Sequence, residues 1–312
     1  SSSSRGLGDV YKRQILMSDN DKTLNEIVST LISERKRDYR NRVLFRVFVI
    51  VLFLFFLFLA PLAKNINFNQ PHIAVIEING LISSETQASA DKIVPLLKQA
   101  SNNANTSAII IKINSGGGSA TQSKIIFDEI LKIKKDTDKD VISIIEDVGA
   151  SGGYYIAMAA DEIFASETSI VGSIGVRLDS YDVRSFFNKL GIKSRTIYSG
   201  ENKLILDPFY ELTPKQYDHV KKLTDQIHKQ FINDLQMSRN DKIKSDSSIF
   251  SGLFYTGSEA RSLGLVDGIS SIYELKSQRY NDLPIQKYNS DNDILNQIIK
   301  SSLHFLSQSR IN

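Results

Sequence analysis

The chain has 312 residues, of which 41% are hydrophobic and 23% are charged, enough to bury the core of one large domain or two small ones. The formal net charge of +3 gives no reason to expect a nucleic-acid partner. The absence of cysteine excludes thiolate nucleophiles, zinc–thiolate sites and disulfides. No group of histidines or carboxylates has ligand spacing, so we expect neither a metal nor an organic cofactor.

The N-terminal residues divide into two short segments. Residues 1–16 contain neither a methionine nor a hydrophobic period, so we interpret them as a non-native leader and take Met17 as the start. Residues 17–42 follow and are rich in Arg and Lys towards their end. We expect this second segment to lie in the cytoplasm.

Residues 43–63 are predicted to form a single transmembrane anchor. They are dominated by Phe, Leu, Val and Ile, carry only Arg46 as a charge, and number about 20, the length that spans a bilayer. The segment before the anchor is rich in Lys and Arg, whereas Lys64 is the only Lys or Arg between the anchor and Lys92. The positive-inside rule therefore places the N-terminus in the cytoplasm and the rest of the chain outside it. A buried core helix and a cleaved signal peptide are the alternatives. The unbroken Phe/Leu run argues against a buried core helix. Pro61 stands where a cleavage site requires a small residue, so we predict a retained anchor rather than a cleaved signal peptide.

Residues 64–285 are predicted to form one α/β domain. Apolar strand patterns alternate with helical patterns, which favours parallel pairing in one sheet. Residues 286–312 are expected to be an amphipathic tail, helical over 291–305. The expected strands are 72–78, 108–113, 141–145 and 163–164, with an apolar run at 169–176; the expected helices are 88–100, 122–134, one beginning near Ser151, and a long one over 213–240 capped by Thr213.

Two loops of small residues each follow a buried strand. The first reads Asn-Ser-Gly-Gly-Gly-Ser over residues 114–119, and the second reads Gly-Ala-Ser-Gly-Gly-Tyr over residues 149–154. Ser151 would begin a helix between small residues, where its hydroxyl can meet a substrate and nearby backbone N–H groups can stabilise an oxyanion. Taken alone, the pattern fits an ordinary N-cap serine and tight glycine turns equally well.

A serine nucleophile also needs a base. No histidine lies near the second loop in the sequence. A lysine can act instead when burial lowers its pKa from about 10.4, because a neutral amine then accepts the proton. Lys203 lies beside an apolar stretch in YSGENKLILDPF, although a solvated loop lysine is the simpler interpretation from the residues alone.

Six segments within residues 73–272 resemble, in order, the bacterial signal peptide peptidases of the SppA or protease IV family. They read HIAVIEINGLI, INSGGG, EDVGASGGYYIAMAADEIFAS, SIVGSIGV, YSGENKLILDPF and YTGSEARSLGLVDGI. The resemblance implies a ClpP/crotonase-like spiral of β-β-α units. It also implies Ser151 as nucleophile, Lys203 as general base, backbone oxyanion donors at Gly117 and Gly152, and Ser173 as a residue that orients the lysine.

The resemblance further implies a reaction, a substrate and an assembly. A membrane-anchored serine endopeptidase would cleave apolar signal-peptide remnants through an acyl-enzyme, as a ring-forming homo-oligomer on the outer face of the bacterial inner membrane. The dyad would form within or between subunits. Gly116 stands where the family usually has proline, which should loosen the first loop without removing an amide donor. For Ser173, a polar residue packed at a strand end is the alternative.

Three other functions stay open. A crotonase-like hydratase shares the fold but lacks the anchor and the serine–lysine pair. A non-catalytic membrane scaffold of related fold would have lost the dyad, whereas both residues are present here. A SohB-type protease shares the dyad, and the short distance from the anchor to the first strand favours the SppA type over it.

Overall fold

The computed structural model of the chain describes residues 30, 32, 34–55, 70–239, 241–244 and 246–289. The chain divides into two compact units, Ser1–Asn67 and Phe68–Asn312. The expected leader, the expected helix at 291–305 and most of the expected tail lie outside the described residues.

The described part of the first unit is helical. Residues 34–55 form a continuous helix, and residues 56–63 of the expected anchor lie outside the described residues. Among the residues that the structure describes, no helix is both long enough and apolar enough to cross a bilayer. The transmembrane anchor therefore stays a prediction.

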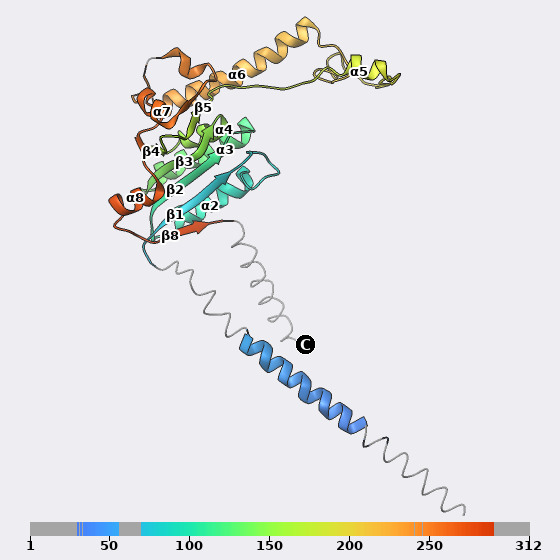
Figure 1. Cartoon of the computed structure of the whole chain (residues 1–312), viewed down its shortest axis with the longest axis vertical. Helices are drawn as coiled ribbons and strands as arrows, with labels where there is room; N and C mark the ends of the chain where they lie inside the picture. The colour runs from blue at the N-terminus through green and yellow to red at the C-terminus, as the bar shows by residue number, and fades with distance from the viewer. Residues whose placement is uncertain are drawn as a thin grey trace, which may run out of the picture. The chain divides into compact units, whose positions relative to one another are not determined.

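In the described residues of the second unit, eight strands form one mixed sheet in the order β6-β5-β3-β2-β1-β8, with β4 pairing with β3 and β7 (Figure 1). All pairs are parallel except β5 with β6, which confirms the α/β class and the parallel pairing of the first strands. The strands are β1 (His72–Asn79), β2 (Thr106–Ser115), β3 (Asp140–Ala150), β4 (Glu162–Ala165), β5 (Ile170–Gly172), β6 (Phe254–Thr256), β7 (Gly268–Ile269) and β8 (Ile285–Tyr288).

Helices cover both faces of this sheet. The helices are α2 (Ala90–Asn102), α3 (Ala120–Asp136), α4 (Gly152–Ala157), α5 (Arg184–Lys189), α6 (Pro214–Arg239), α7 (Gly257–Leu263) and α8 (Ile272–Arg279), with a 3-10 turn η1 (Ser247–Phe250). Alternate residues of β1 enter different clusters: Ile76 packs with α2, α3 and α4, whereas Val75 packs with α8 on the opposite face (Figure 1). Burial on both faces explains why β1 and β2 read as nearly continuous apolar runs.

Helix α6 is only partly packed. Its start matches the prediction, because Pro214 is its first residue and the Thr213 hydroxyl accepts a hydrogen bond from Gln216 N at 3.3 Å. Its apolar residues recur every three or four positions, and among them Phe231 is buried, but Leu223 and Tyr217 are exposed. The N-terminal half of α6 thus carries apolar side chains without a packing partner within the described part of the chain.

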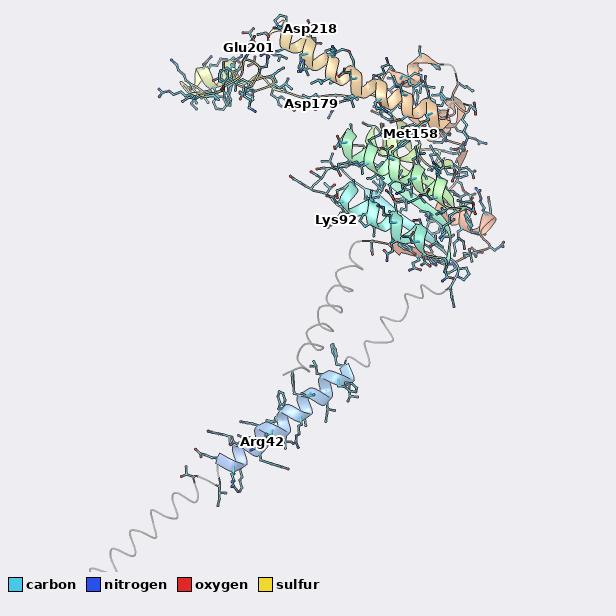
Figure 2. The ribbon with its side chains drawn as sticks, turned by 180° about the vertical axis from the view of Figure 1, so that it is seen from behind. Arg42, Lys92, Met158, Asp179, Glu201 and Asp218 are labelled. Carbon is cyan, nitrogen blue, oxygen red and sulfur yellow. The ribbon has the colours of Figure 1, made fainter. Side chains whose placement is uncertain are left out.

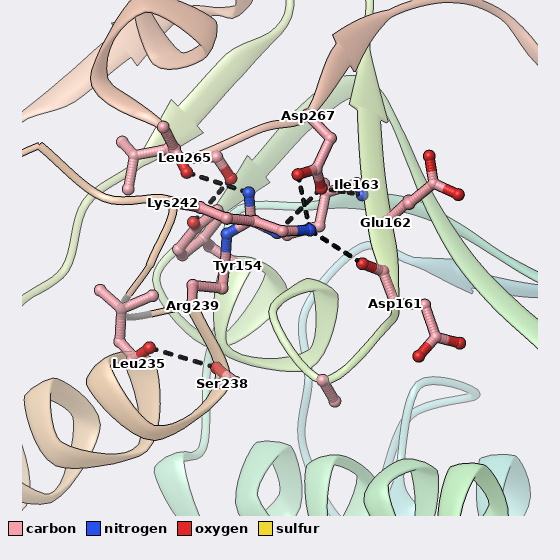
Figure 3. Close-up of polar contacts among 12 residues, drawn as sticks. Tyr154, Asp161, Glu162, Ile163, Leu235, Ser238, Arg239, Lys242, Leu265 and Asp267 are labelled. Carbon is pink, nitrogen blue, oxygen red and sulfur yellow. Dashed lines mark hydrogen bonds and ion pairs between the residues drawn. The ribbon is translucent and has the colours of Figure 1, made fainter.

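The C-terminal end of α6 is fixed to the sheet by a buried ion pair (Figure 3). The Arg239 side chain is 1% exposed, and it donates from one Nη to Asp267 Oδ2 and from the other to Gly264 O, both at 2.9 Å. Asp267 also accepts from Ile163 N at 2.8 Å and pairs with Lys242 at 2.8 Å. These contacts join α6 to the strands β4 and β7, so the C-terminal half of α6 has a fixed position beside the sheet.

Residues 177–213, which we call the arm, leave the body between β5 and α6. The arm includes α5, and no residue in it is buried. Its exposed apolar side chains include Tyr181, Phe186 and Ile197. In Figure 1 the arm lies with the N-terminal end of α6, away from the sheet.

Candidate active site

The turn between β3 and α4 holds Ser151 in an unusual backbone conformation. Its φ of 50° and ψ of −120° lie outside the regions that residues with a Cβ normally occupy. Such conformations cost about 1–3 kcal/mol and persist where the surrounding structure imposes them. Here Ser151 N donates to Gly172 O, and Ser151 O accepts from Tyr155 N, both at 2.8 Å. The turn is therefore held from β5 on one side and from α4 on the other.

The two glycines after Ser151 are required by packing. A Cβ on Gly152 would lie 2.5 Å from Ser123 Oγ, and a Cβ on Gly153 would lie 2.6 Å from Ser115 O. Real Cβ atoms do not approach other atoms so closely. The sequence Ser-Gly-Gly thus lets α4 begin directly against α3 and the end of β2, and Ser151 is the residue that immediately precedes α4.

The loop that follows β2 packs against the Ser151 turn. A Cβ on Gly117 would lie 2.8 Å from Ser151 Cβ and 2.6 Å from Gly152 N. Gly117 has a φ of 100°, and Gly118 has a φ of 150°, which residues with a side chain rarely adopt. Both predicted loops therefore meet, as the shared carboxyl edge of the parallel strands β2 and β3 requires.

A cavity of about 780 Å³ opens at this junction. It brings together four of the five predicted site residues: Ser151, Gly117, Gly152 and Ser173. Its other walls come from the turn after β1, from the first residues of the arm and from α6. These walls include Leu81, Ala120, Tyr155, Val176, Arg177, Asp179, Ile227, Phe231 and Gly252.

Ser173 lies at the wall of this cavity, directly after β5. It has a φ of 52°, and its N–H donates to Leu253 O at 2.7 Å. Its neighbour Gly172 accepts the hydrogen bond from Ser151 N, so the two serines stand on adjacent backbone segments. The position fits both interpretations of Ser173, as an orienting hydroxyl and as a polar residue at a strand end.

Lys203 is not brought to the cavity within one chain. It lies in the arm, in a turn where its N–H donates to Gly200 O at 3.0 Å, and its side chain is exposed. Figure 2 shows the neighbouring Glu201 at the outer end of the arm, well away from Met158 at the end of α4. The single chain thus presents a serine, glycine-loop amides and a cavity, without the predicted base.

Sequence reasoning did not identify the apolar wall that α6 adds to the cavity. Phe231 is 3% exposed and packs on Tyr155 with a ring-centroid distance of 4.5 Å. The Tyr155 hydroxyl donates to the Asp234 carboxylate, which also accepts from Gln230 Nε2 at 3.0 Å. Burial and this carboxylate raise the pKa of Tyr155 well above its usual range. The spacing of the apolar residues in α6 indicated that one side of this helix is buried, but it did not indicate which edge of the sheet the helix would cover.

The site offers no evident ligand set for a metal. Within the described part of the chain, no three His, Asp or Glu residues are grouped so that they could hold an ion. The chemistry that the geometry supports is nucleophilic: a strained serine turn, backbone amides and a cavity with one apolar wall form the frame of a serine hydrolase on an α/β fold.

Comparison with known proteins agrees with this class. The profile of peptidase family S49 matches residues 133–282, and the Clp protease profile matches residues 74–171. A Synechocystis protein described as a protease, slr0021, is 32% identical over 200 residues, which cover 64% of this chain and 70% of that protein. The chain belongs to peptidase family S49.

Two further relatives differ in name. A protein of Enterococcus faecium described as the signal peptide peptidase SppA is 27% identical over 232 residues, covering 70% of this chain and 67% of that protein. A Brucella melitensis protein named the Na(+)/H(+) antiporter NhaA is 36% identical over 218 residues, covering 68% of this chain. This chain spans only 30% of the Brucella protein's length, so the antiporter name is not carried over.

Proposed function

We propose that the chain is a membrane-anchored serine endopeptidase that degrades cleaved signal peptides through a Ser151–Lys203 dyad. The observation that carries this proposal is the conformation of Ser151, which is held at a φ of 50° and lines a cavity together with Gly117 and Gly152. Membership of family S49 and the similarity to a protein described as SppA support the choice of reaction and substrate.

The reaction would be acyl transfer. The Lys203 amine accepts the proton of Ser151 Oγ as this oxygen bonds to the peptide carbonyl carbon, and the carbonyl oxygen becomes an oxyanion held by loop amides. The carbon–nitrogen bond then breaks, and the departing amine takes the proton from the lysine. Water attacks the acyl-enzyme and gives one proton to Lys203. The ester bond to Ser151 then breaks, the acid product leaves, and Lys203 returns the proton to Ser151 Oγ.

We propose that Lys203 reaches the nucleophile of a neighbouring copy in a ring. In the single chain the arm has no buried residue, although it displays Tyr181, Phe186 and Ile197 on its surface. The arm and the exposed N-terminal half of α6 form an apolar surface of the kind that subunit interfaces cover. A head-to-tail interface that closes into a ring would bury this surface and place each arm beside the next subunit's cavity.

The proposed substrate follows from the wall of the cavity. Tyr155, Ile227 and Phe231 offer an apolar lining next to Ser151, which suits the apolar core of a signal peptide. An anchor at residues 43–63 would hold the ring on the outer face of the bacterial inner membrane, where such peptides remain after export. The alternatives are a SohB-type protease of the same family and a non-catalytic membrane scaffold of the same fold.

Complementation between two inactive variants tests both the dyad and its location. Ser151→Ala chains retain the lysine, and Lys203→Met chains retain the serine, so each alone should lose cleavage of an apolar fluorogenic peptide. Refolded or co-expressed as a one-to-one mixture, they should regain about a quarter of the wild-type activity if each site combines two neighbouring copies. The full chain in detergent is the appropriate sample.

Each outcome of this experiment has a distinct meaning. If the mixture stays inactive while both variants assemble like the wild type, the dyad forms within one chain. Full activity of Lys203→Met would disprove the base assignment. An inert wild type, with no covalent labelling of Ser151 by a fluorophosphonate, would favour a non-catalytic scaffold.

A further inference from the structure

Packing does not hold the turn that carries Lys203. The lysine is exposed, and its N–H donates to Gly200 O at 3.0 Å within the turn. Gly200 has a φ of 99°, and a Cβ on it would meet nothing within 4 Å, so no neighbouring group restrains the backbone before the lysine. A general base needs a defined position, because a misplacement of about 1 Å can cost about 100-fold in rate. The position of this turn therefore depends on its hydrogen bonds.

The residues after Lys203 are bonded to the other limb of the arm. Leu206 O accepts a hydrogen bond from Ser180 Oγ at 2.9 Å, and Pro208 O accepts one from Val183 N at 3.0 Å. Both bonds lie wholly within the arm. They order the turn on one side, but they do not place it relative to the rest of the domain.

Gln216, in the first turn of α6, bonds to the other side of the lysine turn. Its Oε1 accepts a hydrogen bond from Thr213 N at 3.1 Å, and its Nε2 donates to Asn202 Oδ1 at 3.2 Å. A backbone N–H can only donate, so the bond from Thr213 sets the orientation of the Gln216 amide and directs Nε2 to Asn202. Asn202 immediately precedes Lys203. One side chain thus joins the N-terminus of the helix to the lysine turn, and Figure 2 shows Glu201 of this turn at the same end of α6 as Asp218.

The helix that carries Gln216 is itself fixed to the body of the domain. His228 Nε2 donates to Ile174 O at 3.0 Å, and the ring of Phe231 packs on α4. Gln216 precedes Ile227, which lines the cavity, by about 17 Å along the helix axis at 1.5 Å per residue. The continuous helix therefore holds the lysine turn at a set distance from the cavity of its own chain.

Building on the proposed function, we propose that Gln216 is the positioning residue of the base: it ties the Lys203 turn to α6, so that the helix determines where the lysine lies. The exposed Tyr217 and Leu223 of the same half of α6 would contact the neighbouring copy. The surface that docks and the lysine that reacts then belong to one rigid element. Docking of two copies thereby brings the base of one to Ser151 of the other.

Four single substitutions in the full chain in detergent separate this link from the helix cap. Asn202→Ala removes the link and keeps the cap. Thr213→Ala removes the hydroxyl that accepts from Gln216 N at 3.3 Å and keeps the link. Gln216→Ala removes both side-chain bonds of Gln216. Gln216→Glu keeps both, because one carboxylate oxygen accepts from Thr213 N and the other accepts from the Asn202 amide after this exposed amide turns over.

Asn202→Ala and Gln216→Ala should lower kcat for the fluorogenic peptide about three- to tenfold, with KM within about twofold of the wild type. This factor is the population shift that follows the loss of one ordinary hydrogen bond, and the cavity walls that determine KM are unchanged. Thr213→Ala and Gln216→Glu should keep kcat within about twofold of the wild type. Wild-type kcat in Asn202→Ala, or an equal loss in Thr213→Ala, would overturn the inference.

The mixture of two inactive variants provides a matched control, because the same substitution can be placed on either chain. Ser151→Ala chains supply the lysine, and Lys203→Met chains supply the serine. Asn202→Ala added to the Ser151→Ala chain should lower the regained activity by the same factor as in the single variant. Added to the Lys203→Met chain, it should leave the regained activity unchanged. Equal losses on both chains would reject the positioning role, because a general effect on folding or assembly does not depend on which chain supplies the lysine.

Failure of the proposed function gives a different set of results. If Lys203→Met keeps full activity, the lysine is not the base, and the inference falls with the proposed dyad. If the mixture without Asn202→Ala stays inactive, the dyad forms within one chain. The kcat of the Asn202→Ala variant alone then decides whether Gln216 positions the lysine.

Discussion

The ion pair between Arg239 and Asp267 allows a graded test of how α6 is held. Asp267→Ala would leave the Arg239 guanidinium, whose side chain is 1% exposed, buried without its counter-charge. Breaking a buried pair in this way costs about 3–5 kcal/mol. It would also leave Ile163 N, which donates to Asp267 at 2.8 Å, without an acceptor, so we expect the upper part of that range.

Arg239→Met should cost less, because it removes the buried charge and keeps most of the side-chain volume. Asp267 would still pair with Lys242 at 2.8 Å and accept from Ile163 N. The remaining loss is the hydrogen bond to Gly264 O and part of the ion pair, about 1–2 kcal/mol. The two variants should therefore differ by about 2 kcal/mol or more.

Urea unfolding of the full chain, followed by circular dichroism, measures this difference. Two kilocalories per mole correspond to a midpoint separation of roughly 1 M at ordinary slopes. Because Ile227 and Phe231 of α6 line the cavity, the same samples should show a raised KM for peptide substrate in the less stable variant. If the two variants had equal urea midpoints, or if Arg239→Met had the lower one, the conclusion that this ion pair holds α6 against the sheet would be refuted.

Three further results are expected. Although burial opposes it, hydrogen bonds from Arg239 and Lys242 lower the pKa of Asp267. The stabilising contribution of Asp267 is therefore complete above the unfolded pKa of about 3.9 and is lost as the pH falls through the folded pKa, so Asp267→Asn should flatten the acid side of a stability–pH curve. Gly257→Ala should lower the melting temperature by several degrees, because a Cβ there would overlap Ser166 O. Tyr155→Phe removes the donor to Asp234, a residue only 5% exposed, and should cost about 1–3 kcal/mol in the same urea assay.

The central strands could be predicted from the sequence because their physical cause is local. Residues 108–113 and 141–145 are apolar enough to be buried on both faces, and β2 and β3 indeed pair in parallel with Ile109 opposite Val141. The small-residue loops after these strands were predicted to carry chemistry. Parallel strands end at one edge, so the sequence order alone places Ser151 and Gly117 together.

The sequence also marked α6 without indicating its surroundings. Its period of apolar residues and its Thr213 cap are local features, and both are present in the structure. The ion pair between Arg239 and Asp267 decides which apolar residues of α6 are covered, and only the tertiary fold brings these two residues together. The exposed half of the helix therefore has no signature that distinguishes it from the buried half.

By itself, the sequence determined the α/β class, the parallel pairing of the core strands and a serine in a glycine-rich turn, because each depends on periodicity or on neighbours in the chain. Only the tertiary structure decided the state of the site. It leaves Lys203 in the exposed arm, because no packing among the described residues draws the outer part of the arm back to the cavity. It turns Gly117 N–H onto the Ser115 hydroxyl, because that hydroxyl is held by Gly80 O, a group distant in sequence.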